Sequence, residues 1–204
     1  MKFINNIIYN VLCVTRNKQT LTLVNKIAKI DDYNLIIPKL YLGNIKKSND
    51  INFLQNNNIQ AIINCTENEE FCSYFNDKSK YRLSVKDSKD ENNMKLFKKE
   101  IEEAIDFIEI NIKEDKNVYI HCYWGLMRSA TVIAGYLIKT YKISHIDAIN
   151  IIKEQRPKAL SSLYNFNEIL KYLEDKYVNE NVNENINKNI NENMNENMNE
   201  NMKI

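Results

Sequence analysis

The sequence predicts an α/β domain with a central, mostly parallel sheet of about four to five strands flanked by helices. Short apolar runs typical of buried strands alternate along the chain with longer stretches whose apolar residues recur every three or four positions. This alternation indicates a parallel sheet, because successive parallel strands need long crossover connections, which are usually helical. The 204 residues suit one domain of ordinary size with an extension at each end.

The first half of the domain is expected to contain short extended segments and one helix. LIIPKLYLGN at 35–44 predicts two extended pieces on either side of Pro38. Ser48 is expected to cap a helix through INFLQNNN. The runs IQAIINC at 59–65 and YRLSV at 81–85 are expected to be strands, because they are short and bounded by polar stretches.

The second half of the domain is expected to hold one strand and four helices. From Asn93 to Lys113 the apolar residues show the spacing of an amphipathic helix. Ser144 and Asp147 resemble a capping box that opens a later helix, and Pro157 lies in the break after it. The expected elements are a helix at 93–113, a strand at 118–122, and helices at 128–141, 144–155 and 163–177.

Composition and charge argue against several classes of function. The net charge of +1 gives no broad argument for a nucleic-acid or membrane partner. No apolar run is long enough to cross a bilayer, and asparagines interrupt the apolar N-terminal stretch, so no signal peptide is expected. The four cysteines form no Cys-x-x-Cys pair and only two histidines accompany them, so neither a zinc site nor a disulfide scaffold is expected. The expected compartment is the reducing cytoplasm, with the nucleus left open as a second one.

Two segments lie outside the expected domain. Residues 1–33 form an N-terminal extension without a clear period, whose role is unknown and for which docking of a partner is one hypothesis. From 178 to 204 the chain repeats a four-residue unit rich in asparagine, which is a poor helix former. This low-complexity tail is expected to be disordered, with weak self-association as the alternative.

A cysteine and an arginine stand at the two ends of the loop between the strand at 118–122 and the helix at 128–141. Such a connection turns backbone N–H groups into one hollow beside a helix N-terminus, which suits a tetrahedral dianion. Arg128 can hold two phosphate oxygens with its planar fork, and Gly125 relieves the backbone at the turn. The same donors favour a thiolate, so the pKa of Cys122 is expected to be depressed and its sulfur to act as a nucleophile.

Cleavage of a phosphate ester also requires a proton donor for the leaving oxygen. Asp87, Asp90 and Glu91 follow the expected strand at 81–85, whose carboxyl end should share a sheet edge with Cys122. Asp87 is the preferred candidate because it lies nearest the strand end. An acid that must be protonated while the thiol is ionised predicts a bell-shaped pH profile with an acidic optimum.

The run IHCYWGLMRSATVIAGYLI resembles the His-Cys-x5-Arg-Ser signature of dual-specificity protein phosphatases, members of the protein tyrosine phosphatase superfamily. Four further runs are similar to that family's Leu-Tyr-Leu-Gly opening, its next strand, its general-acid loop and its closing segment: IIPKLYLGNI, IQAIINCT, VKDS and RPKALSSLYNFNEILKYLE. The resemblance implies a phosphatase-like catalytic domain at 34–177, phosphorylated proteins as partners, and no requirement for a metal or other cofactor.

The resemblance also implies a role for each site residue. Cys122 would form the cysteinyl-phosphate, while Arg128 would bind phosphate and the transition state. Asp87 would protonate the leaving group and then deprotonate the attacking water. Ser129 would help the cysteine leave in the second step, and His121 would brace the loop and help set the thiol pKa. The phosphate-binding loop would consist of Tyr123, Trp124, Gly125, Leu126, Met127 and Arg128.

Departures from the family pattern leave other hypotheses open. Trp124 stands where a small residue is usual and Met127 where serine is common, and the alternative of a phosphate-binding module with little turnover rests on these two residues. Ser162 and Leu163 replace a common Pro-Asn pair, which puts the usual support of the acid loop in doubt. A lipid or RNA phosphatase is a third hypothesis, and the absence of lysine and arginine between Cys122 and Arg128 argues weakly against a lipid.

Cys65 is the one further cysteine with a candidate role. It ends the strand expected beside Cys122 and, if the two approach, could trap an oxidised Cys122 as a disulfide. The plainer interpretation is a buried core cysteine.

Overall fold

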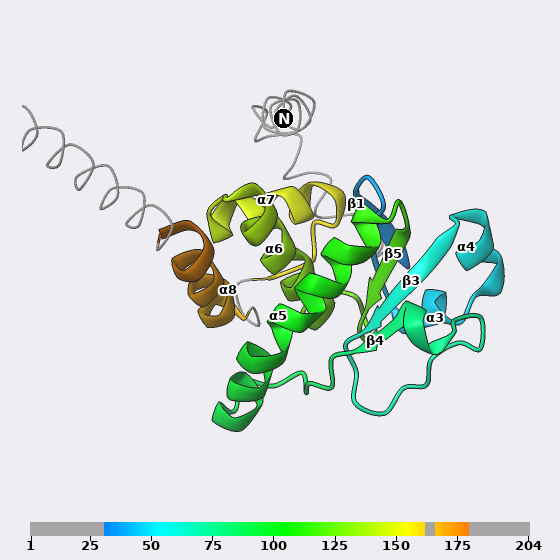
Figure 1. Ribbon diagram of the computed structural model, residues 1–204. Helices are drawn as coiled ribbons and strands as arrows, with labels where there is room; N and C mark the ends of the chain where they lie inside the picture. Colours follow the sequence, from blue (N-terminus) through cyan, green and yellow to red (C-terminus); the bar gives the residue numbers. More distant parts are fainter. Residues whose placement is uncertain (1–30, 162–165, 180–204) are drawn as a thin grey trace, which may run out of the picture.

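The structure, a computed structural model, describes residues 31–161 and 166–179. Its centre is a five-stranded sheet in the order β1-β2-β5-β3-β4, in which β1 and β2 are antiparallel and the other neighbouring strands are parallel (Figure 1). The strands are β1 Tyr33–Ile37, β2 Leu40–Gly43, β3 Ile59–Asn64, β4 Lys80–Arg82 and β5 Asn117–His121. The predicted α/β fold with a mostly parallel sheet is therefore confirmed.

Helices cover both faces of this sheet, as Figure 1 shows, with four larger helices on one face and two short ones on the other. The larger helices are α5 Glu91–Lys113, α6 Arg128–Tyr141, α7 His145–Gln155 and α8 Asn167–Glu174. The short ones are α3 Ile45–Ser48 and α4 Ile51–Asn56. A 3₁₀ turn, η1 Asp77–Ser79, precedes β4, and a π-helical turn, η2 Asp175–Asn179, follows α8.

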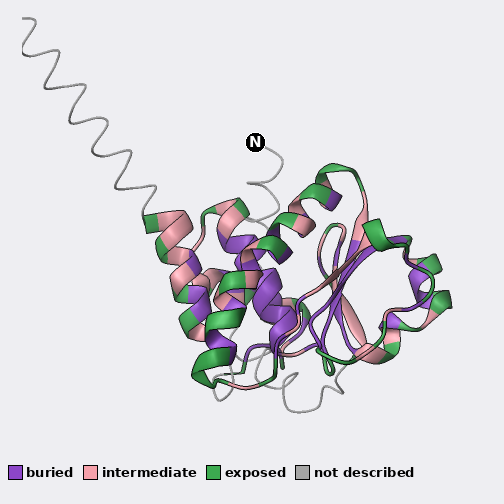
Figure 2. Ribbon diagram, turned by 60° about the horizontal axis from the view of Figure 1, so that its bottom comes forward, coloured by how far each residue is buried: buried purple, intermediate pink, exposed green. Residues whose placement is uncertain are grey.

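The alternating side chains of β5 build a core on each face of the sheet. Val118 and Ile120 belong to the large core beneath α5, α6, α7 and α8. Tyr119 belongs to the smaller core with Phe53 and Leu54 of α4. Helix α6 is buried along most of its length, as the purple central helix of Figure 2 shows. Because α6 follows β5 after a loop of a few residues, its N-terminus is fixed at the carboxyl end of the central strand.

Several expected boundaries differ from the structure. The prediction that Ser48 caps a helix is wrong, because Asp50 caps α4 by accepting from the Phe53 amide, whereas Ser48 ends α3 and donates to the Ile45 carbonyl. Helix α5 begins two residues before the predicted Asn93, with Asp90 as its cap. The predicted cap of α7 is confirmed, since the Ser144 hydroxyl accepts from the backbone amide three residues on.

The strand predicted at 81–85 is also misplaced, because β4 ends at Arg82. Arg82 pairs with Asn64, the last residue of β3, so the parallel ladder stops there although Leu83 and Val85 remain buried. The helix predicted at 163–177 is seen as α8 and η2, with 162–165 outside the described residues.

Most of the two extensions lies outside the described residues. Residues 1–30 of the extension predicted at 1–33 are not described, and neither are residues 180–204 of the tail predicted at 178–204. Docking of a partner by the extension and disorder of the tail therefore remain predictions. Within 31–161 and 166–179, no helix combines the length and the apolar character needed to cross a membrane.

Candidate active site

Two loops that carry predicted site residues meet at the carboxyl edge of the parallel strands. Cys122 directly follows β5, and Arg128 is the first residue of α6. Asp87 lies in the segment between β4 and α5. A pocket of about 380 Å³ opens between these loops and is lined by Asp87, Leu126, Met127, Lys158 and Ser161. The parallel topology thus brings together residues from separate parts of the chain.

The loop after Cys122 is held against β2 by its glycine. Gly125 has φ +67, in the left-handed region that favours glycine, and it lies directly on the backbone of Gly43. The Ile45 amide donates to the Tyr123 carbonyl at 3.2 Å, which fixes the start of the loop to the residue that opens α3. The Leu-Tyr-Leu-Gly segment therefore ends at the residue on which the loop rests.

Cys122 is fully buried among hydrogen-bond donors. Its Sγ accepts from the Ser129 hydroxyl at 3.3 Å, and the backbone amides of Leu126 and Ser129 also point at the sulfur. Burial raises the pKa of the Cys122 thiol, but the Arg128 guanidinium and these donors outweigh it, so the pKa lies below its usual range. The site therefore favours a thiolate at Cys122.

Arg128 connects the cysteine loop to the loop that carries Asp87. Its Nη1 donates to the Val85 carbonyl at 3.2 Å, and its Nη2 lies 3.4 Å from Asp87 Oδ2. Both contacts are longer than a strong charge-assisted hydrogen bond, and its buried Nε makes no hydrogen bond with any described residue. Since a buried N–H group without a partner is costly, this guanidinium is suited to donate to an oxyanion beside Cys122.

Of the three acidic candidates, Asp87 is the one that faces Arg128. Its side chain is half-exposed at the mouth of the pocket. Asp90 accepts from the Asn93 amide and caps α5. Glu91 forms an ion pair of 2.7 Å with Lys95 one turn along the helix. This geometry favours Asp87 as the acid and gives the other two carboxylates structural contacts.

His121 is a buried, neutral ring at the end of β5. It stacks on Tyr119 with ring centroids 5.8 Å apart, and burial lowers the pKa of His121 to about 3. The Cys122 backbone opposes this lowering in part through a hydrogen bond with the ring. A neutral ring adds no positive charge beside the thiol, which leaves packing and the contact with the Cys122 backbone as the ways in which it can act on the loop.

Arg156 is a site residue that the sequence analysis missed. It is buried after α7, and it donates from Nε to the Gly125 carbonyl at 2.7 Å and from Nη2 to the Trp124 carbonyl at 3.1 Å. Its Nη1 also donates to Asp31 and Asn34 at the start of the described chain. These bonds fix the two loop carbonyls on Arg156. The only sequence signal was an arginine before Pro157, which says nothing of its distant partners.

The side chains of the loop divide into inward and outward groups. Trp124 is 61% exposed and packs edge-to-face against the exposed Tyr123 ring, with centroids 5.2 Å apart. Met127 is buried and lines the pocket with Leu126. The contacts to sulfur involve the amides of Leu126 and Ser129, and phosphate binding by the amides of the loop stays a prediction.

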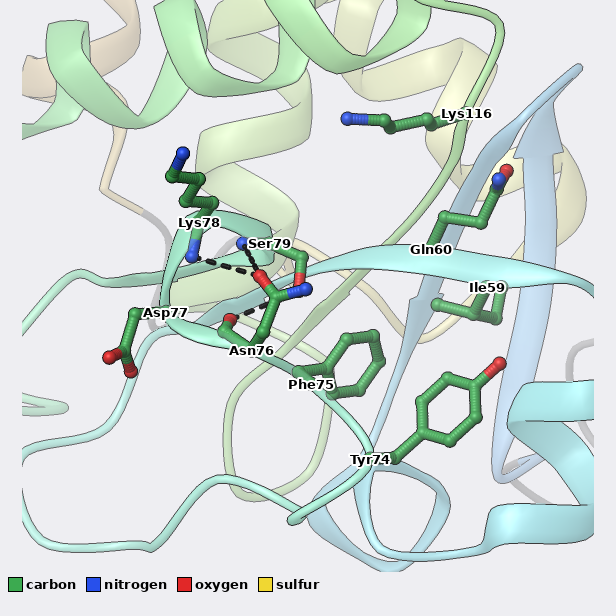
Figure 3. A pocket seen from close by; sticks show the side chains of 9 residues that line it. All are labelled: Ile59, Gln60, Tyr74, Phe75, Asn76, Asp77, Lys78, Ser79 and Lys116. Atoms are coloured by element: carbon green, nitrogen blue, oxygen red, sulfur yellow. Dashed lines mark hydrogen bonds between the residues drawn. The ribbon is translucent and has the colours of Figure 1, made fainter.

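A second pocket, of about 640 Å³, opens at the opposite edge of the sheet (Figure 3). Residues from the amino ends of β3 and β5 and from the segment around η1 line it: Ile59, Gln60, Tyr74, Phe75, Asn76, Asp77, Lys78, Ser79 and Lys116. The Asn76 side chain accepts from the amides of Lys78 and Ser79, as the dashed lines in Figure 3 show. Asp77 and Lys116 are paired with Lys80 and Glu114. This pocket contains none of the predicted site residues, so the smaller pocket is the candidate active site.

No group of acidic, histidine and cysteine side chains within 31–161 and 166–179 is arranged to hold a metal ion. Cys65 lies beside Cys122, because the preceding residues Asn64 and His121 are paired and the Cys65 amide donates to the His121 carbonyl at 2.8 Å. Burial raises the pKa of Cys65 well above its ordinary value, so this neighbour is held as a thiol.

Comparisons with known proteins agree on one family. The family model "Dual specificity phosphatase, catalytic domain" matches residues 40–176. Dual specificity protein phosphatase 2 of Mus musculus is 32% identical over 141 residues, which cover 68% of this chain and 42% of that protein, so the chain spans less than half of its length. The crystal structure of DUSP15 has a TM-score of 0.59 and 25% identity, covering 71% of this chain and 86% of that one. The crystal structure of PTPMT1 in complex with PI(5)P has a TM-score of 0.55 and 22% identity, covering 71% and 94%, and shares the fold alone.

Proposed function

The chain belongs to the dual specificity phosphatase family, and from this premise we propose that it is a protein phosphatase acting on phosphotyrosine and phosphoserine or phosphothreonine. The proposed reaction passes through a cysteinyl-phosphate intermediate. The observation that carries the proposal is the environment of Cys122, whose pKa is lowered despite complete burial by Arg128 and a set of hydrogen-bond donors. The same donors that favour a thiolate are those that a phosphate dianion requires.

In the first step, the Cys122 thiolate attacks phosphorus in line with the ester oxygen. An S–P bond forms as the P–O bond to the substrate side chain breaks, and the leaving oxygen takes a proton from the Asp87 carboxylic acid. Arg128 holds two equatorial oxygens and stabilises their charge in the transition state. The contact of 3.4 Å between Arg128 and Asp87 supports this assignment, because it keeps the acid beside the group that would bind phosphate.

In the second step, the Asp87 carboxylate takes a proton from water while the water oxygen attacks phosphorus. The S–P bond breaks, inorganic phosphate leaves and Cys122 returns to the thiolate, which the Ser129 hydroxyl stabilises by its hydrogen bond of 3.3 Å. The role proposed for His121 is to brace the loop by packing on Tyr119.

The position of Trp124 weakens the argument for a catalytically weak binding module. Its indole is one of the two bulky side chains on which this alternative rests, and it is 61% exposed, so it does not fill the hollow around Cys122. Met127 keeps the alternative open, because its buried side chain lines the pocket. A lipid or RNA phosphatase is the other alternative, and Lys158, which lines the pocket, is a cation that could meet further phosphates.

Hydrolysis of an aryl phosphate from pH 5 to 8 tests the proposal. We expect a bell-shaped profile with an acidic optimum, no turnover by Cys122→Ser, and loss of the basic limb in Asp87→Asn. A wild type that binds orthovanadate but is as inactive as Cys122→Ser would instead support the binding module. For an active wild type, a panel of phosphopeptides, phosphoinositides and RNA 5′-phosphates separates the protein phosphatase from the other two.

A further inference from the structure

The segment that carries Asp87 has little backbone structure of its own. It leaves the sheet at Arg82, where β4 ends, and enters α5 at Glu91. Leu83 and Val85 are buried anchors, whereas Lys86 and Asp87 are exposed. An exposed segment without strand pairing must be held by side chains if Asp87 is to stay at a fixed place.

The Asn93 side chain holds this segment on both sides of Asp87. Its Oδ1 accepts from the Lys86 amide at 2.8 Å. Its Nδ2 donates to the Lys86 carbonyl at 3.0 Å and to the Ser88 carbonyl at 2.7 Å. Both N–H groups and one lone pair of the amide are thus used on the two residues that flank Asp87.

Asn93 is itself anchored on a rigid element. It lies in the first turn of α5, its backbone amide donates to Asp90 Oδ1 at 2.9 Å, and it is buried. The next residue, Met94, and Phe97 one turn along enter the large core. The Asn93 side chain therefore ties the two residues that flank Asp87 to the core.

Only an amide of this length combines these contacts. Aspartate would keep the acceptor for the Lys86 amide but would face two carbonyl oxygens without N–H groups to offer. Alanine would remove all three bonds. A general acid must lie within hydrogen-bond reach of the leaving oxygen, so a small displacement of Asp87 should slow proton transfer without changing the thiolate.

We propose that Asn93 is the positioning residue of the acid: it holds Lys86 and Ser88 so that Asp87 faces Arg128 and the leaving oxygen. The inference rests on the proposed function, because it assigns Asn93 a part in the proton donation that the proposal gives to Asp87. It also names a support for the acid loop within α5, independent of the closing segment.

The test compares two esters that differ in their need for a proton. 4-Nitrophenolate leaves readily without protonation, whereas phenol, with a pKa of about 10 like that of tyrosine, needs an acid. The measured quantity is the ratio of kcat/KM for phenyl phosphate to kcat/KM for 4-nitrophenyl phosphate. This parameter includes departure of the leaving group, and the ratio cancels the fraction of folded, active enzyme in each preparation.

We expect Asp87→Asn to lower this ratio at least about tenfold. Asn93→Ala and Asn93→Asp should lower it about three- to tenfold. The basic limb of the pH profile should weaken most in Asp87→Asn and less in the two Asn93 variants. Asn111→Ala is the matched control. Asn111 is also buried on α5 and donates to the Phe107 carbonyl at 2.8 Å, but it lies at the far end of the helix. Its loss should leave the ratio within about twofold of wild type even if stability falls.

A ratio that stays at the wild-type value in both Asn93 variants, while Asp87→Asn lowers it, overturns the inference and leaves the proposed function intact. A wild type that hydrolyses neither ester overturns the proposed function, and the inference with it. An equal fall in Asn93→Ala and Asn111→Ala also overturns it, because a general loosening of α5 would then suffice.

Discussion

Gly125 lies so close to the backbone of Gly43 that a side chain on Gly125 would overlap it. A Cβ on Gly125 would meet the Gly43 carbonyl oxygen at 2.2 Å and its carbonyl carbon at 2.4 Å. Gly43 is confined in turn, since a Cβ there would meet the Tyr119 hydroxyl at 2.3 Å. The loop around Cys122 is therefore positioned by a backbone-to-backbone contact with β2.

Gly125→Ala is expected to displace this loop. Strain at φ +67 together with the overlap on Gly43 should lower the free energy of unfolding by about 2 kcal/mol or more and remove binding of orthovanadate. Urea unfolding and vanadate titration measure the two effects. Gly135→Ala is the control, because its Cβ would meet the terminal carbons of Ile105 and Leu173, which can move. Vanadate affinity preserved in Gly125→Ala would contradict the prediction.

Arg156→Met is expected to weaken phosphate binding without touching the pocket. The variant leaves the carbonyls of Trp124 and Gly125 without their donor, at a cost of about 3 kcal/mol in stability. Carbonyls free to turn towards the sulfur should also weaken vanadate binding. Arg156→Lys should restore little of the vanadate affinity, because one ammonium group cannot place separate N–H donors on both carbonyls as the guanidinium does. Full vanadate affinity in Arg156→Met, measured where the protein is folded, would show that the loop does not need this support.

His121 predicts a loss of stability at mildly acidic pH. Its folded-state pKa of about 3 lies below the ordinary 6.5, so the folded protein binds the proton more weakly than the unfolded chain. The contribution to stability is complete above pH 6.5 and is lost as pH falls towards 3, with about 1.5 kcal/mol lost between pH 6.5 and 5. Urea unfolding at several pH values should therefore show that the free energy of unfolding changes less with pH in His121→Gln than in wild type. Parallel curves would show that the ring is not held neutral.

Oxidation is expected to join Cys65 to Cys122. Peroxide would convert the Cys122 thiolate to a sulfenic acid, whose sulfur the neighbouring Cys65 attacks with loss of water to give a disulfide. Peptide mapping should find this link, and a dithiol should restore activity. The Cys65→Ser variant should recover less activity, because the sulfenic acid at Cys122 is then not trapped as a disulfide and can be oxidised further. Cys72→Ser, in the core on the other face of the sheet, is the control. Peroxide-treated wild type without the linked peptide would contradict the prediction.

The features that the sequence predicted correctly depend on local patterns. The apolar runs of β3 and β5 and the spacing in α5 and α6 set the fold class, and the loop from Cys122 to Arg128 is a continuous segment. Asp87 is likewise singled out on local grounds, as the acidic residue nearest the end of a predicted strand; the structure places it beside Arg128, and its role as the acid stays a prediction.

The features that were missed depend on partners far along the chain. Arg156 donates to the Asp31 carbonyl, 125 positions away, and no local pattern indicates such a bond. The end of β4 is set by the end of its neighbour β3 at Asn64, so the apolar run to Val85 misled the prediction. The sequence indicates Asn93 only as the start of a helix. Its side-chain role is missed because its partners lie in a segment without a regular period.

The exposed side chain of Trp124 has a spectroscopic consequence. It is the single tryptophan of the chain, so all indole emission originates two residues from Cys122. Because its ring is exposed, a ligand that enters the loop should alter the solvent around it and hence the fluorescence. Rapid mixing with orthovanadate would then report association at this loop in real time, without an attached dye.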